Sequence, residues 1–88
     1  MKIKDGFIVR EVAGSYIAMP VGERADEIKG VIELTQGGAI LWKKLSEETT
    51  VDALVAELLN AFEVNEETAR RDTEAFVENL RKNGLLEE

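Results

Sequence analysis

The side chains that could carry acid–base chemistry in this chain are carboxylates, because its 88 residues include no histidine and no cysteine. Histidine is the usual general base and a common metal ligand, and a cysteine thiolate is a frequent nucleophile. The acidic side chains form adjacent pairs at Glu47-Glu48, Glu66-Glu67 and Glu87-Glu88, in predicted loops or helix ends. Pairs in such places are more simply explained as solvated caps or tails. We therefore expect no catalytic residue, and we predict that the protein is not an enzyme.

Phosphate- and metal-binding motifs are also missing from the sequence. Gly37-Gly38 lacks the further glycine and the lysine that nucleotide-binding loops need. The segment 63–67 (EVNEE) is too short for a calcium-binding loop and lacks its glycine. We expect no metal site and no cofactor.

The charge of the chain argues against a nucleic-acid partner. There are 18 acidic and 11 basic side chains, which gives a formal net charge of −7, whereas phosphate binding needs a clustered positive surface. No run approaches the roughly 18 apolar residues of a membrane helix, and the first residues lack the apolar core of a signal peptide. We expect a cytoplasmic protein with no membrane partner.

The first part of the chain has the pattern of β-strands. Residues 7–12 (FIVREV) and 15–20 (SYIAMP) are rich in β-branched and aromatic residues, with a turn signal at Ala13-Gly14 between them. Residues 21–29 are charged and aperiodic, which predicts a loop. Residues 31–34 (VIEL) form a third apolar run and predict a third strand.

After Leu34 the apolar residues follow a helical period of 3.6. Three residues that favour N-caps, Thr35, Thr50 and Asn65, each precede one of three predicted helices. The last of these helices runs over residues 66–83, and Gly84 follows its C-cap. Its predicted core stripe consists of Ala69, Thr73, Phe76 and Leu80. Three strands followed by three helices make one α+β domain over residues 1–88.

Two glycines, Gly37 and Gly38, fall in the first turn of the first predicted helix, although glycine is a poor helix residue. The lack of a Cβ lets a helix end approach a neighbouring element closely. Trp42 follows one turn later as a large core anchor. We expect close packing at these glycines, and a loose entry turn is the alternative.

A peptide could bind if the third strand lies at the edge of the sheet, because an extended segment can pair with its free backbone groups. In the last helix, Arg70, Thr73, Val77 and Arg81 follow a spacing of 3, 4 and 4 residues beside the core stripe. This stripe would suit an acidic, partly apolar peptide. In the alternative interpretation Val77 belongs to the core and the two arginines pair with Glu74 and Glu78.

The order and spacing of several features resemble the PqqD-like family, also called RiPP recognition elements and named for pyrroloquinoline quinone (PQQ) biosynthesis. The N-terminal segment 9–23 (VREVAGSYIAMPVGE) is similar to stand-alone members. The other features that carry the resemblance are Leu34, Gly38, Trp42, Thr50-Val51, Asp72, Phe76, Leu80 and Gly84-Leu85-Leu86.

The resemblance implies a winged-helix-like fold with a three-stranded antiparallel sheet followed by three helices. It also implies a peptide chaperone that binds the leader of a ribosomally made precursor peptide by strand addition, between the third strand and the third helix. Such proteins present the leader to a modifying enzyme, often a radical SAM (S-adenosylmethionine) enzyme that carries the iron–sulfur clusters. The implied peptide-binding positions are Val31, Ile32, Glu33, Leu34, Arg70, Thr73, Val77 and Arg81.

Two other functions remain open at this point. A winged-helix transcription regulator would use its helices on DNA or on other proteins. An interaction module would bind a folded partner but no isolated peptide. An exposed third strand could also pair with a second copy of the chain, so the sequence leaves the oligomeric state open.

Overall fold

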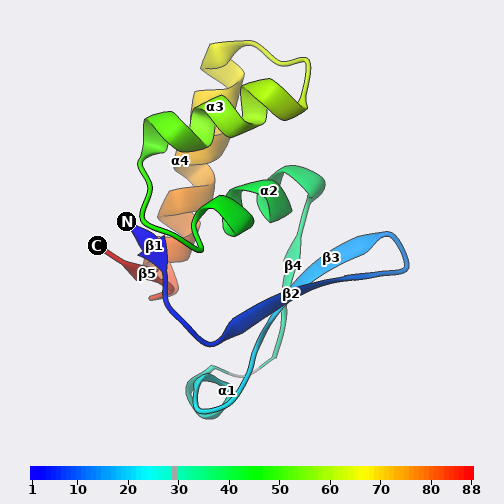
Figure 1. The fold of residues 1–88 in the computed structure, drawn as a ribbon, viewed down its shortest axis with the longest axis vertical. Coiled ribbons are helices and arrows are strands. Elements are labelled where there is room, and N and C mark those ends of the chain that lie inside the picture. The colour runs from blue at the N-terminus through cyan, green and yellow to red at the C-terminus, as the bar shows by residue number, and fades with distance from the viewer. Residues whose placement is uncertain (29) are drawn as a thin grey trace.

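A computed structural model describes residues 1–28 and 30–88 of the chain. Its three long helices lie together on one side of a small sheet, and the two ends of the chain meet beside each other (Figure 1). In chain order the elements are β1 (Lys2–Ile3), β2 (Phe7–Val12), β3 (Ser15–Pro20), α1 (Arg24–Glu27), β4 (Ile32–Leu34), α2 (Gln36–Lys44), α3 (Val51–Ala61), α4 (Glu66–Lys82) and β5 (Leu86–Glu87).

The main sheet has the order β2-β3-β4 and is antiparallel throughout, as predicted. Ala13 and Gly14 both have positive φ, at 52° and 82°, in the two-residue turn between β2 and β3. Positive φ at both central residues is typical of a type I′ turn, whose twist matches that of the paired strands. This hairpin fixes a register in which Val12 lies opposite Ser15 and Phe7 opposite Pro20.

Two small features were not predicted from the sequence. The strands β1 and β5 form a separate two-stranded sheet, with Ile3 opposite Leu86, and this pairing brings the chain ends together. The helix α1 lies within the predicted loop, where the Nε–H of Arg24 donates to the carbonyl oxygen of Asp5 at 2.8 Å. Lys29, the last residue of that predicted loop, lies outside the described residues.

Side-chain caps begin the three long helices at the predicted residues. Thr35 accepts a hydrogen bond from the backbone N–H of Gly38 at 2.9 Å, and Thr50 accepts one from Ala53 at 3.2 Å. Asn65 caps α4 in the same way. Each cap satisfies a backbone donor that the first turn leaves without an internal partner.

The core lies among α2, α3 and α4 and between α2 and the inner face of the sheet. Ala18 on β3 and Leu54 on α3 are fully buried, and the rings of Phe7 and Trp42 meet edge to face with centroids 5.5 Å apart. On α4 the buried stripe is Ala69, Thr73, Val77 and Leu80. The predicted stripe contained Phe76 in place of Val77, so this part of the prediction was wrong.

Within the described residues, the helices are all too short or too polar to cross a membrane.

Candidate functional site

The strand β4 lies at an edge of the main sheet. One side of β4 pairs with β3, so that Ile32 faces Ala18, Glu33 faces Ile17 and Leu34 faces Tyr16. No strand of the described residues covers its other side. The backbone groups along that side can therefore pair with an added chain.

The side chains of β4 alternate between the two faces of the sheet. Ile32 and Leu34 are half-buried and pack against the helical core. Glu33 is exposed and shares the outer face with its partner Ile17. This alternation follows from the two-residue period of a strand, and it gives an added strand an apolar inner side and a charged outer side.

A groove of about 370 Å³ runs between β4 and α4, and we call it the β4–α4 groove. It continues past Phe76 and Asn79 into a hollow of about 560 Å³ beside α2 and α3. Phe76 supplies the largest apolar side chain that α4 contributes to the groove. The lining residues from the strand and from this helix are Ile32, Glu33, Leu34, Phe76, Asn79, Leu80 and Asn83.

Gly38 leaves room for the ring of Phe76 where the groove continues into the hollow. A Cβ at this position would lie 3.2 Å from Cε1 of Phe76 and 3.2 Å from Oγ1 of Thr35. Both contacts are tighter than ordinary van der Waals separation, so the missing side chain lets α2 approach Phe76 of α4 and leaves room for the capping hydroxyl of Thr35. The close packing expected at the two glycines is confirmed at Gly38, whereas a Cβ at Gly37 would meet only ordinary contacts at 3.7 Å.

The four positions predicted from the last helix do not line this groove. Thr73 and Val77 are 0% and 3% exposed and belong to the core. The Oγ1 of Thr73 has no hydrogen-bond partner among the described residues. Arg70 and Arg81 lie on other parts of the helix surface, so they do not flank the groove with positive charge. From the strand, Ile32, Glu33 and Leu34 do line it. Val31, the fourth position predicted there, precedes β4, is 56% exposed and does not line the groove.

Both arginines are held by carboxylates. Arg70 contacts Glu66 and Asp52 at 3.2 and 3.0 Å, and the hydrogen bonds that it donates to these two carboxylates raise its pKa.

Arg81 contacts Glu88 and Glu78, each at 2.7 Å. The hydrogen bond to Arg81 lowers the pKa of Glu88, and the pKa of Arg81 is raised in turn. The alternative interpretation of the stripe is thus confirmed for Val77 and for the Arg81–Glu78 pair, while Arg70 pairs with Glu66 and Asp52 in place of Glu74.

The charged side chains that line the groove and its continuation are acidic. Among the described residues they are Glu33 on β4 and Asp72 on α4. No ion pair or hydrogen bond found within residues 1–28 and 30–88 involves the carboxylate of either one. The groove therefore presents negative charge and apolar surface to a ligand.

The sequence interpretation missed the polar residues that α4 contributes. Asp72, Phe76, Asn79 and Asn83 are spaced by 4, 3 and 4 residues and form one face of the helix. The spacing was present in the sequence. Assigning Phe76 to the core hid this face, since Phe76 is its only apolar member.

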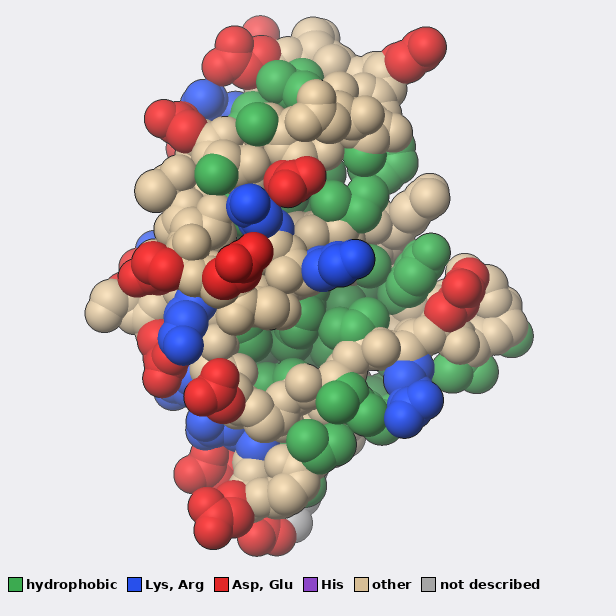
Figure 2. Space-filling model, in the orientation of Figure 1, with side chains coloured by type: hydrophobic (Ala, Val, Ile, Leu, Met, Phe, Trp, Pro, Cys, Tyr) green, Lys and Arg blue, Asp and Glu red, His purple; other side chains and the backbone are tan. Residues whose placement is uncertain are grey.

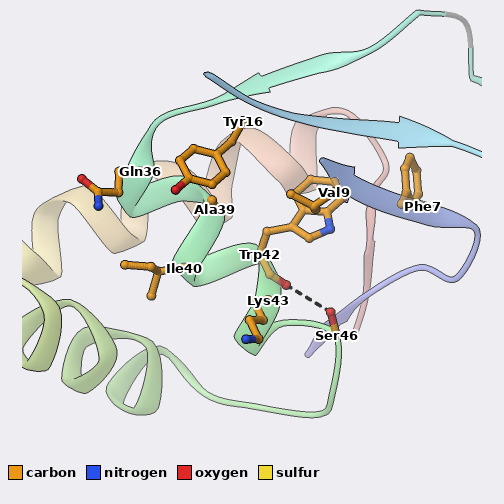
Figure 3. Close-up of a pocket in the computed structure, with 9 residues that line it drawn as sticks. All are labelled: Phe7, Val9, Tyr16, Gln36, Ala39, Ile40, Trp42, Lys43 and Ser46. Carbon is orange, nitrogen blue, oxygen red and sulfur yellow. Dashed lines mark hydrogen bonds between the residues drawn. The ribbon is translucent and has the colours of Figure 1, made fainter. Parts of the chain in front are cut away.

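A second hollow of about 480 Å³ lies on the other side of α2, next to the opposite edge of the sheet. The side chains of Val9, Tyr16 and Trp42 reach it from β2, β3 and α2 (Figure 3). Hydrophobic side chains gather at the middle of this face of the molecule, between the helices and the hairpin (Figure 2). Lys43 is the charged residue among its lining.

The described residues contain no group of three or more acidic side chains placed to hold a metal ion. What the β4–α4 groove offers is backbone hydrogen bonding along one strand, an apolar floor and the carboxylate of Glu33, and its continuation adds that of Asp72.

Comparison with known proteins gives two matches. Residues 8–86 match the family model described as Coenzyme PQQ synthesis protein D (PqqD). A solved structure described as TbiB1 in complex with the TbiA(beta) leader peptide has the same fold, with a TM-score of 0.74 and 22% sequence identity. That match covers 99% of this chain and 95% of the other. No curated protein matches the chain at a significant level.

Proposed function

The chain belongs to the PqqD family, and on that premise we propose that it is a peptide chaperone, a single domain that binds the leader of a ribosomally made precursor peptide. The leader adds as a strand to the free edge of β4 and lies in the β4–α4 groove. Its backbone pairs with β4, and its inward side chains contact Phe76 and the half-buried residues of the strand.

The observation that carries this proposal is the free edge of β4 beside an apolar groove. An extended peptide gains affinity from main-chain hydrogen bonds and gains selectivity from pockets for alternate side chains. The β4–α4 groove provides both at one place. The similarity to a protein whose structure holds a leader peptide supports the same assignment.

The bound leader is then delivered to a modifying enzyme, for which a radical SAM enzyme is our proposal from the family resemblance. In this scheme the chain supplies binding and orientation, and the iron–sulfur chemistry belongs to the enzyme. Holding the leader fixes the peptide close to the enzyme, which raises its effective concentration there.

The structure gives a DNA-binding role little physical support. A helix that reads DNA meets phosphates with free cationic side chains. Arg70 and Arg81 are each held by two carboxylates, and breaking those pairs would cost part of the energy of phosphate binding. The other two basic residues of α4, Arg71 and Lys82, share the helix with five acidic side chains. Peptide binding by strand addition needs neither arginine.

Fluorescence anisotropy tests the proposal. The probe is a fluorescein-labelled leader segment from the short precursor peptide encoded beside the gene, and the control is the core segment of the same peptide. We expect saturable binding of the leader segment and none of the core segment. Saturable, salt-sensitive binding to a duplex DNA, with no binding of the leader segment, would contradict the proposal and favour a regulator.

A further inference from the structure

The β4–α4 groove also indicates which kind of peptide it selects, an inference that rests on the function proposed above. We propose that the bound segment carries a lysine or arginine between two apolar residues, with the basic side chain opposite Glu33. Glu33 is then a specificity-determining residue of the site.

The register of the sheet places this basic residue. Residues directly opposite each other on paired strands lie on the same face, with Cβ atoms about 4.5–5.5 Å apart. Glu33 lies on the outer face opposite Ile17. A residue of an added strand opposite Glu33 would therefore also lie on the outer face, within reach of its carboxylate.

The neighbours of that basic residue in the peptide point the other way. Successive side chains alternate between faces, so the residues before and after it point inward with Ile32 and Leu34. There they meet Phe76 across the groove. Apolar side chains at these two positions bury surface without leaving a polar group unpaired.

The charges around the site favour a cation at the outer position. Glu33 has no ion-pair partner among residues 1–28 and 30–88, and Asp72 supplies a second carboxylate in the hollow that continues from the groove. The formal net charge of −7 attracts cationic peptides over longer distances and speeds their association. This peptide differs in charge from the acidic one expected from the sequence, because Arg70 and Arg81 neither line the groove nor are free.

The effect at this one position is modest but measurable. An opposite-charge pair across two strands strengthens binding by roughly two- to fivefold relative to a neutral pair, and a like-charge pair weakens it by a similar factor. A lysine and a glutamate peptide should therefore differ by roughly tenfold in affinity at low salt, and by less at high salt.

Selection from a displayed peptide library tests the inference, because it reports which side chain is preferred at each position of a bound segment. A random library of short segments is selected on the wild-type protein and on three single variants, Glu33→Lys, Glu33→Gln and Arg10→Glu. Arg10 lies on the outer face of β2, on the other side of Ile17, so Arg10→Glu is the matched control at the other edge. Glu33 and Arg10 are exposed, so their substitutions should leave the fold intact.

The wild type and Arg10→Glu should both enrich peptides with lysine or arginine between two apolar residues. Glu33→Lys should enrich aspartate or glutamate at the same place, and Glu33→Gln should enrich neither charge. The same enrichment from the wild type and Glu33→Lys would overturn the inference. If the peptides enriched on both proteins still compete with the leader segment for binding, the proposed function stands and only the role of Glu33 is overturned. A selection with no enriched peptide, together with no binding of the leader segment, would overturn both.

Discussion

Two edges of the main sheet are covered by no strand of residues 1–28 and 30–88, and they differ in what lies beside them. The strand β4 is three residues long and its inner side chains face α4 across a groove that contains Phe76. The strand β2 is six residues long, and its exposed half projects beyond the helices in the hairpin with β3 (Figure 1). Beside β2 lies the hollow of Val9, Tyr16 and Trp42.

Backbone groups alone do not distinguish these edges, since each strand has unpaired donors and acceptors along one side. The side chains do. On the outer face, Ile17 lies between Arg10 on β2 and Glu33 on β4, so the two edges present opposite charges at mid-strand. An edge therefore selects a peptide through its neighbouring helix and its outward charge.

Removing the largest apolar contact of the groove should give the largest effect on binding. Phe76→Ala should weaken the affinity for the leader segment by about tenfold or more, because aromatic anchors in a groove contribute most to binding. Val9→Ala, at the hollow beside β2 and without a partner on β4, is the control and should change that affinity far less. Both are measured by anisotropy, after circular dichroism has shown each variant folded. A larger loss for Val9→Ala would move the site to the other edge.

The two glycines of α2 should respond differently to alanine. Gly38→Ala forces a Cβ against Phe76 and Thr35 and should lower the free energy of unfolding by about 1–3 kcal/mol. Gly37→Ala meets ordinary contacts and gains helix propensity, so it should be neutral or stabilising by up to about 1 kcal/mol. Urea unfolding measures both. Equal effects would mean that close approach at Gly38 does not set the groove.

Thr73 tests which face of α4 the peptide meets. Its hydroxyl is buried without a hydrogen-bond partner among the described residues, so Thr73→Val should raise the free energy of unfolding by about 1 kcal/mol. The affinity for the leader segment should not change, since the side chain lies in the core. Reduced affinity in a variant that is at least as stable would indicate contact with the peptide.

The Arg81–Glu88 pair gives the smallest effect and a test of pH dependence. Hydrogen bonding to Arg81 lowers the folded-state pKa of Glu88. The pair therefore stabilises the fold at neutral pH, and this contribution is lost as the pH falls through the lowered pKa. Carboxyl NMR titration should give a titration midpoint for Glu88 below that of an ordinary glutamate. In Arg81→Gln this midpoint should rise back to the ordinary glutamate value. An unchanged midpoint would mean that Arg81 is free to meet an acidic peptide.

Much of the fold followed from local patterns. The hairpin was predicted because alternation and the Ala13-Gly14 turn agree, and the long helices because caps at Thr35, Thr50 and Asn65 precede periodic runs. The small sheet of β1 and β5 was not predicted, because each of its strands has only two residues and so shows no periodic pattern. Its strands form only when the chain ends meet, where the N–H of Ile3 also donates to the carbonyl oxygen of Leu45 at 2.8 Å.

The groove was predicted on its strand side and missed on its helix side. Phe76 and Val77 are adjacent apolar residues, and either could complete the core stripe of α4 at a helical period. Tertiary packing decides between them. Val77 fills the space among the helices, whereas the larger ring of Phe76 lies against Gly38 at the edge of the core. A one-residue choice rotates the helix by about 100°, which moved the predicted site onto buried residues and paired arginines.

The most direct test of the central claim is an isotope-filtered NMR experiment on the labelled protein bound to the unlabelled leader segment. It detects protons of the peptide that lie in close contact with protons of the protein. Strand addition at β4 predicts contacts from the peptide backbone to Ile32, Glu33 and Leu34, and from its side chains to the ring of Phe76. Contacts to β2 and to the hollow of Val9, Tyr16 and Trp42, with none to β4, would contradict the account.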